Sequence, residues 1–165
     1  MYRIRRTVLY LSLFIAALLQ ASAPGLPWVR YVKPDILLAS VIFFSLYGGK
    51  WRGLEAGIFA GFLHAVFSVT SASADILVYG LCGYLLGCNY NKFYKESLLL
   101  QVALSFASVL VAYGAYYLYQ GTTSAAYPFF YVLTGIIMPS AIFTACASPV
   151  IFFILKKLVR PVRYI

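Results

Sequence analysis

Charged residues are scarce in this sequence. Only 10% of its 165 residues are Asp, Glu, Lys or Arg, and only four are acidic. A soluble globular domain carries about 25% charged residues, so this chain is too poor in charge to cover an ordinary water-facing surface. With 63% hydrophobic residues and a mean hydropathy of +0.88, it is predicted to be an integral membrane protein with a single domain over residues 1–165.

Residue types that carry catalysis or bind metals are also rare. There is one histidine, and the three cysteines lie within apolar runs without a Cys-x-x-Cys spacing. We find no paired carboxylates, no His-Glu-x-x-His motif and no phosphate-binding glycine loop. We therefore predict no enzyme activity, no catalytic residue, no cofactor and no metal site, and we interpret the cysteines as packing residues.

The net charge of +9 raises the question of nucleic-acid binding. Such binding needs basic residues gathered on a face of their own. Here they form short clusters between apolar runs, which is the pattern that orients a membrane protein. The basic residues therefore indicate membrane topology, and we predict no nucleic-acid partner.

Six apolar runs are candidate transmembrane helices, which predicts an all-α compact bundle. They cover residues 7–23, 35–48, 53–70, 75–89, 97–120 and 130–155. The second run is short and reaches across only if the bilayer thins or its flanking charges snorkel. Pro139 and Pro149 in the last run predict kinks.

The basic residues support six spans with both termini on the cytoplasmic side of a bacterial inner membrane. Eleven of the 13 then fall inside: Arg3, Arg5, Arg6, Lys50, Arg52, Lys92, Lys95, Lys156, Lys157, Arg160 and Arg163. Residues 21–23 also imitate a signal-peptide cleavage site. The first run is therefore either a cleaved signal peptide or a retained transmembrane helix, and we favour the retained helix.

Small residues recur every fourth position in three of the runs. They are Gly53, Gly57 and Gly61 in the third, Gly83 and Gly87 in the fourth, and Ala17 and Ala21 in the first. Residues four apart lie on one helix face, and small residues let helix backbones approach closely in lipid. Two interpretations stay open, packing within the bundle and a groove for a partner protein's helix.

His64 lies near the middle of the third run, where a charged side chain has an unfavourable free energy of insertion into the bilayer. We favour a buried ring that a neighbouring helix hydrogen-bonds. A proton relay would need a carboxylate at the same depth, and we expect none there. Asp35 and Asp75 are interpreted as helix caps at the outer interface, and Glu55 as a snorkelling charge.

Tyrosines gather at the outer ends of the last two runs. They form either an interfacial aromatic belt or the lining of an outer pocket. For the pocket interpretation the candidates are Asp75, Tyr116 and Tyr119.

Three segments together resemble a known family. They are KPDILLASVIFFSLYGG (33–49), GLEAGIFAGFLHAVFS (53–68) and DILVYGLCGYLLG (75–87). A basic residue-Pro-Asp start, a glycine-rich third span and the Gly83-Tyr84-Leu85 segment are similar to the rod-shape-determining protein MreD family. That family commonly has an aspartate eight residues after the first glycine of a pair in the third span. Counted from Gly57, this position is Ala65 in this chain, with His64 one residue earlier.

The resemblance implies a non-enzymatic membrane scaffold of the bacterial cell-elongation machinery. Its implied partners are membrane lipid, an MreC-type protein with one membrane span and, more loosely, the MreB filament and peptidoglycan synthases. The MreD fold is also similar to the substrate-binding subunits of energy-coupling-factor vitamin transporters. That likeness supplies an alternative function, the capture of a small molecule, with Ala17 and Ala21 facing the transporter scaffold.

Overall fold

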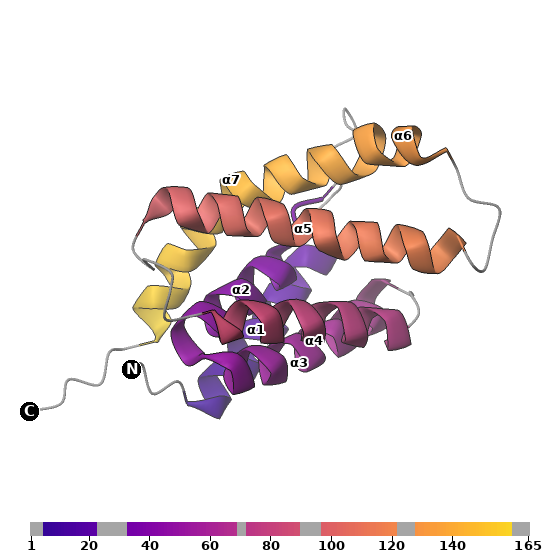
Figure 1. The fold of residues 1–165 in the computed structure, drawn as a ribbon. Helices are drawn as coiled ribbons and strands as arrows, with labels where there is room; N and C mark the ends of the chain where they lie inside the picture. Colours follow the sequence, from indigo (N-terminus) through magenta and orange to yellow (C-terminus); the bar gives the residue numbers. More distant parts are fainter. Residues whose placement is uncertain (1–4, 23–32, 69–71, 90–96, 122–127, 160–165) are drawn as a thin grey trace, which may run out of the picture.

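The computed structural model describes residues 5–22, 33–68, 72–89, 97–121 and 128–159, and no strand occurs within these ranges. Its elements are α1 (Arg6–Ser22), α2 (Ile36–Gly48), α3 (Lys50–Ser68), α4 (Ala72–Cys88), α5 (Leu98–Gly121), α6 (Phe129–Val132), the π-helical stretch η2 (Leu133–Ile137) and α7 (Met138–Leu158). Figure 1 shows α5 and α7 packed together along one side of the cluster formed by α1 to α4. The prediction of an all-α fold is confirmed.

Helix α2 lies at the centre of the bundle. Every residue from 37 to 47 is buried, and the helix contacts α1, α3, α4, α5 and α7. A helix that is apolar on all sides is one that protein surrounds. Its 13 residues span only about 20 Å, less than the ~30 Å hydrocarbon core. The short second run is therefore explained by burial in protein.

A single residue, Gly49, connects α2 to α3. Its φ of 81° lies in the left-handed region, and its N–H donates to the Ser45 carbonyl to close the end of α2. A side chain at this φ is strained, which favours glycine here. The turn sends α3 back antiparallel to α2, against which it packs.

Helices α3 and α4 approach so closely that glycine is needed at the contact. A Cβ added to Gly57 would lie 2.8 Å from the Gly80 Cα, and one added to Gly61 would lie 2.5 Å from the Asp75 carbonyl oxygen. Real Cβ atoms do not approach other atoms this closely. Without these glycines the two backbones would have to separate, and their dispersion contacts would weaken.

The last helical region begins with α6 and passes through η2 into α7. The Met138 N–H donates to the Leu133 carbonyl, a hydrogen bond over five residues. The next residue, Pro139, has no N–H and cannot make the i→i−4 hydrogen bond of an α-helix. The wider π-helical stretch therefore lies directly before the position where an α-helical hydrogen bond is lost. Pro149 lies inside α7, which bends along its length (Figure 1).

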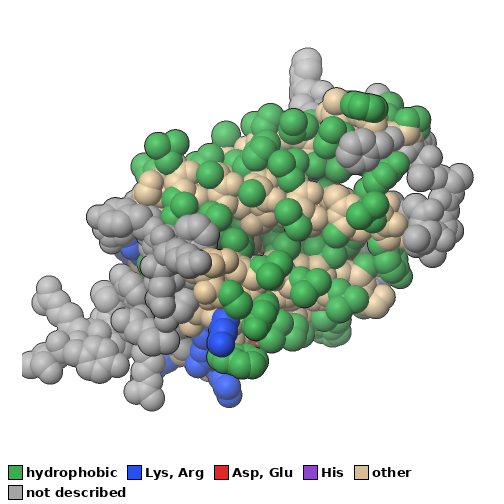
Figure 2. Space-filling model, viewed as in Figure 1, with side chains coloured by type: hydrophobic (Ala, Val, Ile, Leu, Met, Phe, Trp, Pro, Cys, Tyr) green, Lys and Arg blue, Asp and Glu red, His purple; other side chains and the backbone are tan. Residues whose placement is uncertain are grey.

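Apolar side chains are spread over the outside of the bundle (Figure 2). Two helices are long and apolar enough to cross a membrane, Leu98–Tyr119 and Phe130–Leu158, while α1, α2 and α4 are shorter apolar helices. The Lys and Arg side chains visible in Figure 2 gather toward one end. We call it the basic end, and it includes Arg6, Lys50 and Arg52, and the last turn of α7 with Lys156 and Lys157.

Three predicted boundaries differ from the structure by three residues, and one of them is the end of α7, which lies at Leu158 and was predicted at residue 155. Helix α3 begins at Lys50 and α4 at Ala72, each three residues before the predicted start. Among the other basic residues, the structure describes only Arg5 and Lys33, and Lys33 lies next to α2. The rest of the basic residues lie outside the described ranges: Arg3, Arg30, Lys92, Lys95, Arg160 and Arg163.

Candidate functional site

A histidine–carboxylate pair lies at the end of the bundle opposite the basic end. The Nδ1 atom of His64 on α3 is 3.0 Å from Oδ2 of Asp75 on α4. The hydroxyl of Tyr116 on α5 donates to the other carboxylate oxygen, Oδ1. Asp75 has no solvent exposure, and a buried carboxylate is tolerated only where donors and a counter-charge surround it.

A second buried carboxylate, Asp35, lies at the start of α2. Its Oδ1 caps the helix by accepting from the Leu38 N–H (3.0 Å), and its Oδ2 accepts from the Tyr79 hydroxyl (2.7 Å). The Asp35 N–H donates to the Thr144 hydroxyl of α7 (2.9 Å). The N-cap that the sequence predicts is therefore present, and the same residue also joins α2 to α4 and α7.

The two clusters adjoin one another. The rings of His64 and Tyr79 lie with centroids 5.3 Å apart and planes tilted by 30°. We call the whole set the polar network: Asp35, His64, Asp75, Tyr79, Tyr116 and Thr144. Its members come from α2, α3, α4, α5 and α7, so it links five helices at one level of the bundle.

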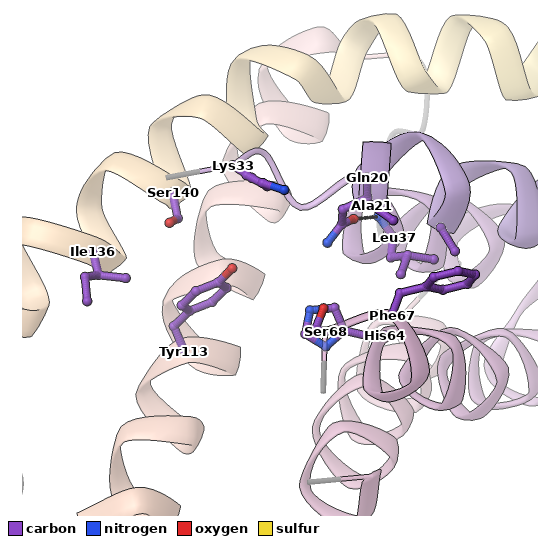
Figure 3. Close-up of a pocket in the computed structure, with 11 residues that line it drawn as sticks. Gln20, Ala21, Lys33, Leu37, His64, Phe67, Ser68, Tyr113, Ile136 and Ser140 are labelled. Carbon is purple, nitrogen blue, oxygen red and sulfur yellow. Dashed lines mark hydrogen bonds between the residues drawn. The ribbon is translucent and has the colours of Figure 1, made fainter. Parts of the chain in front are cut away.

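A cavity of about 390 Å³ lies beside the polar network (Figure 3). Its polar lining is Gln20, Lys33, His64, Ser68, Tyr113 and Ser140, and its apolar lining is Ala17, Ala21, Leu37, Phe67 and Ile136. In Figure 3, Tyr113 and Ser140 face it from α5 and α7, and Gln20 and His64 from α1 and α3. The volume falls within the range of small-molecule pockets, about 300–1,000 Å³.

The hydrogen bonds around the cavity determine which atoms face it. The Gln20 Oε1 atom accepts from the Leu37 N–H (2.9 Å), so the amide nitrogen of Gln20 is left for the cavity. An ionised carboxylate only accepts hydrogen bonds, so His64 donates from Nδ1 to Asp75 and keeps Nε2 for other partners.

A third polar cluster lies at the basic end. Glu55 accepts hydrogen bonds from Tyr10 of α1 and from Arg52 (2.9 Å), and Arg6 Nε lies 3.3 Å from its carboxylate. The interpretation of Glu55 as a simple snorkelling charge is therefore incomplete, because the residue joins α1 to α3. The cluster is partly exposed, and such ion pairs contribute little, about 0–1 kcal/mol.

The small residues singled out in the sequence lie mainly between helices of this chain. Gly53, Gly57 and Gly61 face the backbone of α4, Gly83 faces Gly53, and Gly87 faces Lys50. Ala17 is buried, whereas Ala21 is exposed and lines the cavity. A partner helix could reach the glycine faces only by displacing α4 from α3.

Two expectations about the acids need correction, and the pocket role expected of Tyr119 stays a prediction. The expectation that no carboxylate shares the depth of His64 is wrong, because Asp75 is its hydrogen-bond partner. Asp75 lies in the first turn of α4 and is fully buried, so it is no interfacial cap. Tyr119 is 44% exposed, and the tyrosine that lines the cavity is Tyr113.

Sequence reasoning missed Tyr79, Thr144 and Gln20, and it included Tyr113 only as one of the tyrosines at the outer ends of the last two runs. Asp75 and Tyr79 are four residues apart on α4, and Tyr113 and Tyr116 are three apart on α5, so each pair lies on one helix face. That spacing was an available signal for the tyrosines. No comparable spacing signal pointed to Thr144 or Gln20.

Comparison with known protein families adds a finding that the geometry cannot supply. The family model for the rod shape-determining protein MreD matches residues 1–162. This chain belongs to the MreD family. No curated protein and no solved structure matches it. The expected likeness to vitamin-transporter subunits therefore stays a prediction.

Membership places the chain in a family of membrane proteins that act in rod-shape determination. At the position where MreD proteins commonly have an aspartate, this chain has Ala65, which is buried. The neighbouring His64 contacts Asp75 of the next helix, so an acid is present at this level but comes from α4.

The described ranges contain no cluster of metal-binding side chains. No three His, Cys, Asp or Glu side chains there lie close enough to hold a metal ion. The cysteines are free thiols, with Cys82 buried and Cys88 and Cys146 exposed.

Proposed function

We propose that this protein is a non-enzymatic scaffold of the machinery that elongates rod-shaped bacterial cells. The observation that carries the proposal is the match of the MreD family model to residues 1–162. The use of the polar side chains agrees with a structural role. Glu55, Asp35 and Asp75 all join one helix to another through hydrogen bonds.

The scaffold is proposed to cross the cytoplasmic membrane six times, with both termini inside. Helices α1 to α5 supply five crossings, and the continuous region from α6 through α7 supplies the sixth. The basic end then faces the cytoplasm, as expected for Lys and Arg near membrane surfaces. Asp35, Asp75 and the cavity lie toward the outer side.

We further propose an MreC-type partner with one membrane span, with MreB and the peptidoglycan synthases as more distant members of the assembly. A partner helix needs a small-residue face that the bundle does not already use. On α5, Ala103 and Ala107 are exposed, and nothing lies within 4 Å of a Cβ placed on Gly114. These three positions lie on one face of α5.

The experiment is complementation of a rod-shaped bacterium that has lost its own MreD. The wild-type chain is expected to restore rods, and round cells despite normal membrane expression would contradict the proposed function. Gly114→Leu is expected to fold and to lose the partner in co-purification. Gly61→Leu is the comparison, because it is expected to disrupt folding itself.

The capture-subunit alternative has one observation in its favour, the cavity of about 390 Å³. Purification from native membranes followed by mass spectrometry separates the two functions. A single-span partner together with wall synthases supports the scaffold. A bound vitamin-sized molecule with a transporter scaffold and ATPases would support capture and overturn the scaffold proposal.

A further inference from the structure

The cavity beside the polar network presents hydrogen-bond donors and one positive charge. Lys33 lines it, and in the described part of the chain this ammonium forms no salt bridge. The amide nitrogen of Gln20 faces it because the amide oxygen is held by the Leu37 N–H. The hydroxyls of Tyr113 and Ser140 face it from the opposite side (Figure 3).

The buried carboxylates nearby do not line this cavity. Asp35 is occupied by the Leu38 N–H and the Tyr79 hydroxyl, and Asp75 by His64 and Tyr116. Their oxygen atoms therefore already have donors on the protein side. A ligand in the cavity meets Lys33 and neutral donors directly, at the short distances where electrostatic attraction is strongest.

Apolar side chains line the cavity on both sides. Leu37 and Phe67 line it near Gln20 and His64, and Ile136 lies on the side of Tyr113 (Figure 3). Ligand pockets commonly combine such apolar walls with a few polar groups that orient the ligand. The shape and chemistry suit a molecule with an acidic head and a small apolar body.

We infer that this cavity binds an organic anion, a carboxylate or phosphate group carried on an apolar body, with Lys33 as its counter-charge and Gln20, Tyr113 and Ser140 as donors. The head belongs either to a free small acid or to the headgroup of an anionic lipid. This inference does not depend on the scaffold function, because cell shape and ligand binding are measured separately.

The test uses the purified full chain in nanodiscs of phosphatidylcholine and four probes with the same butyl body. Calorimetry compares butyl phosphate, butyrate, butanol and butylammonium. Binding of the two anions, with at least about tenfold weaker binding of the alcohol and the amine, is the expected result. Equal binding of all four probes, or no anion binding up to about 10 mM, would overturn the inference.

Two variants locate the site. Lys33→Gln keeps a polar side chain and is expected to weaken butyl phosphate binding about tenfold while leaving the thermal melting of the protein unchanged. Lys157→Gln, an exposed position at the basic end, is the matched control and is expected to bind like wild type. Unchanged affinity in Lys33→Gln, or an equal loss in both variants, contradicts the site.

Replacing part of the phosphatidylcholine with phosphatidylglycerol distinguishes the two sources of the anion. If a lipid headgroup occupies the cavity, the anionic lipid competes and the apparent affinity for butyl phosphate falls. If the ligand is a free acid, the affinity stays the same. Either result supports an anion site and identifies which source fills it.

Discussion

His64 Nδ1 lies 3.0 Å from Asp75 Oδ2, and this pair joins the C-terminal half of α3 to the first turn of α4. The pair forms because Gly61, one helical turn before His64, lets the backbone at Asp75 come close. A Cβ on Gly61 would lie 2.5 Å from the Asp75 carbonyl oxygen. The glycine row and the titratable ring are therefore parts of the same helix contact.

The first prediction concerns this buried pair. His64→Phe leaves Oδ2 of the buried Asp75 carboxylate without its donor, and we expect a loss of about 1–3 kcal/mol or more in the free energy of unfolding. The double variant His64→Phe/Asp75→Leu removes both polar groups and is expected to be more stable than His64→Phe. Unfolding in mixed detergent micelles gives both values. A double variant that is no more stable than His64→Phe would contradict this dependence of the buried Asp75 carboxylate on His64.

The second prediction compares two glycines that differ in their surroundings. Gly57→Ala is expected to destabilise the protein by about 1–3 kcal/mol or more, because α4 leaves no room for a methyl group. Gly114→Ala is the control, since its Cβ meets open space, and it is expected to be neutral or stabilising by up to about 1 kcal/mol. The same unfolding assay measures both. A tolerated alanine at position 57 contradicts the close α3–α4 contact.

The third prediction uses two fully buried serines. Among the described residues, the Ser105 hydroxyl is buried without a hydrogen-bond partner, whereas the Ser148 hydroxyl donates to the Ala145 carbonyl (2.9 Å). Ser105→Ala removes an unsatisfied group and is expected to raise the unfolding free energy by about 1 kcal/mol. Ser148→Ala is expected to lower it by about 1 kcal/mol. A loss in both variants would mean that Ser105 has a partner.

The fourth prediction tests the proposed topology. In a variant with its native cysteines replaced by alanine, Lys157→Cys marks the basic end and Ser73→Cys the opposite end, and both positions are exposed. A membrane-impermeant maleimide added to spheroplasts is expected to label Ser73→Cys. Lys157→Cys should react only after the membrane is permeabilised. The reverse labelling pattern would invert the orientation, and labelling of both in intact spheroplasts would contradict the three proposed crossings between the two positions.

Local features of the chain predicted the helices well. The all-α class follows from apolar runs, which are contiguous in the sequence and need no tertiary information. The boundaries of α3 and α4 were less accurate, because Lys50 is charged and Ala72 stands between two serines, so the runs were counted from later residues. The shortness of α2 could be noticed in the sequence, but its central position depends on which helices surround it.

The sequence predicted individual residues of the candidate site but not the contacts between them. His64, Asp75 and Tyr116 were each singled out, but as a lone ring, a cap and a pocket candidate. Their contacts connect residues 11 and 41 positions apart, and the bond from Asp35 to Thr144 spans 109. Such pairs depend on which helices pack together and at what level, and the spacing of residues along one helix does not specify either of these.

The amino-acid composition and the long apolar runs dictate that this chain folds in a membrane as helices, because so few charges cannot solvate a surface and a helix makes its own backbone hydrogen bonds in lipid. The spacing of its glycines dictates close helix contacts. Packing of five helices then brings Asp35, His64 and Asp75 to one level and gives each buried charge its partners. Those pairings exist only in the folded bundle, since an isolated helix would leave each group without its donors from the neighbouring helices.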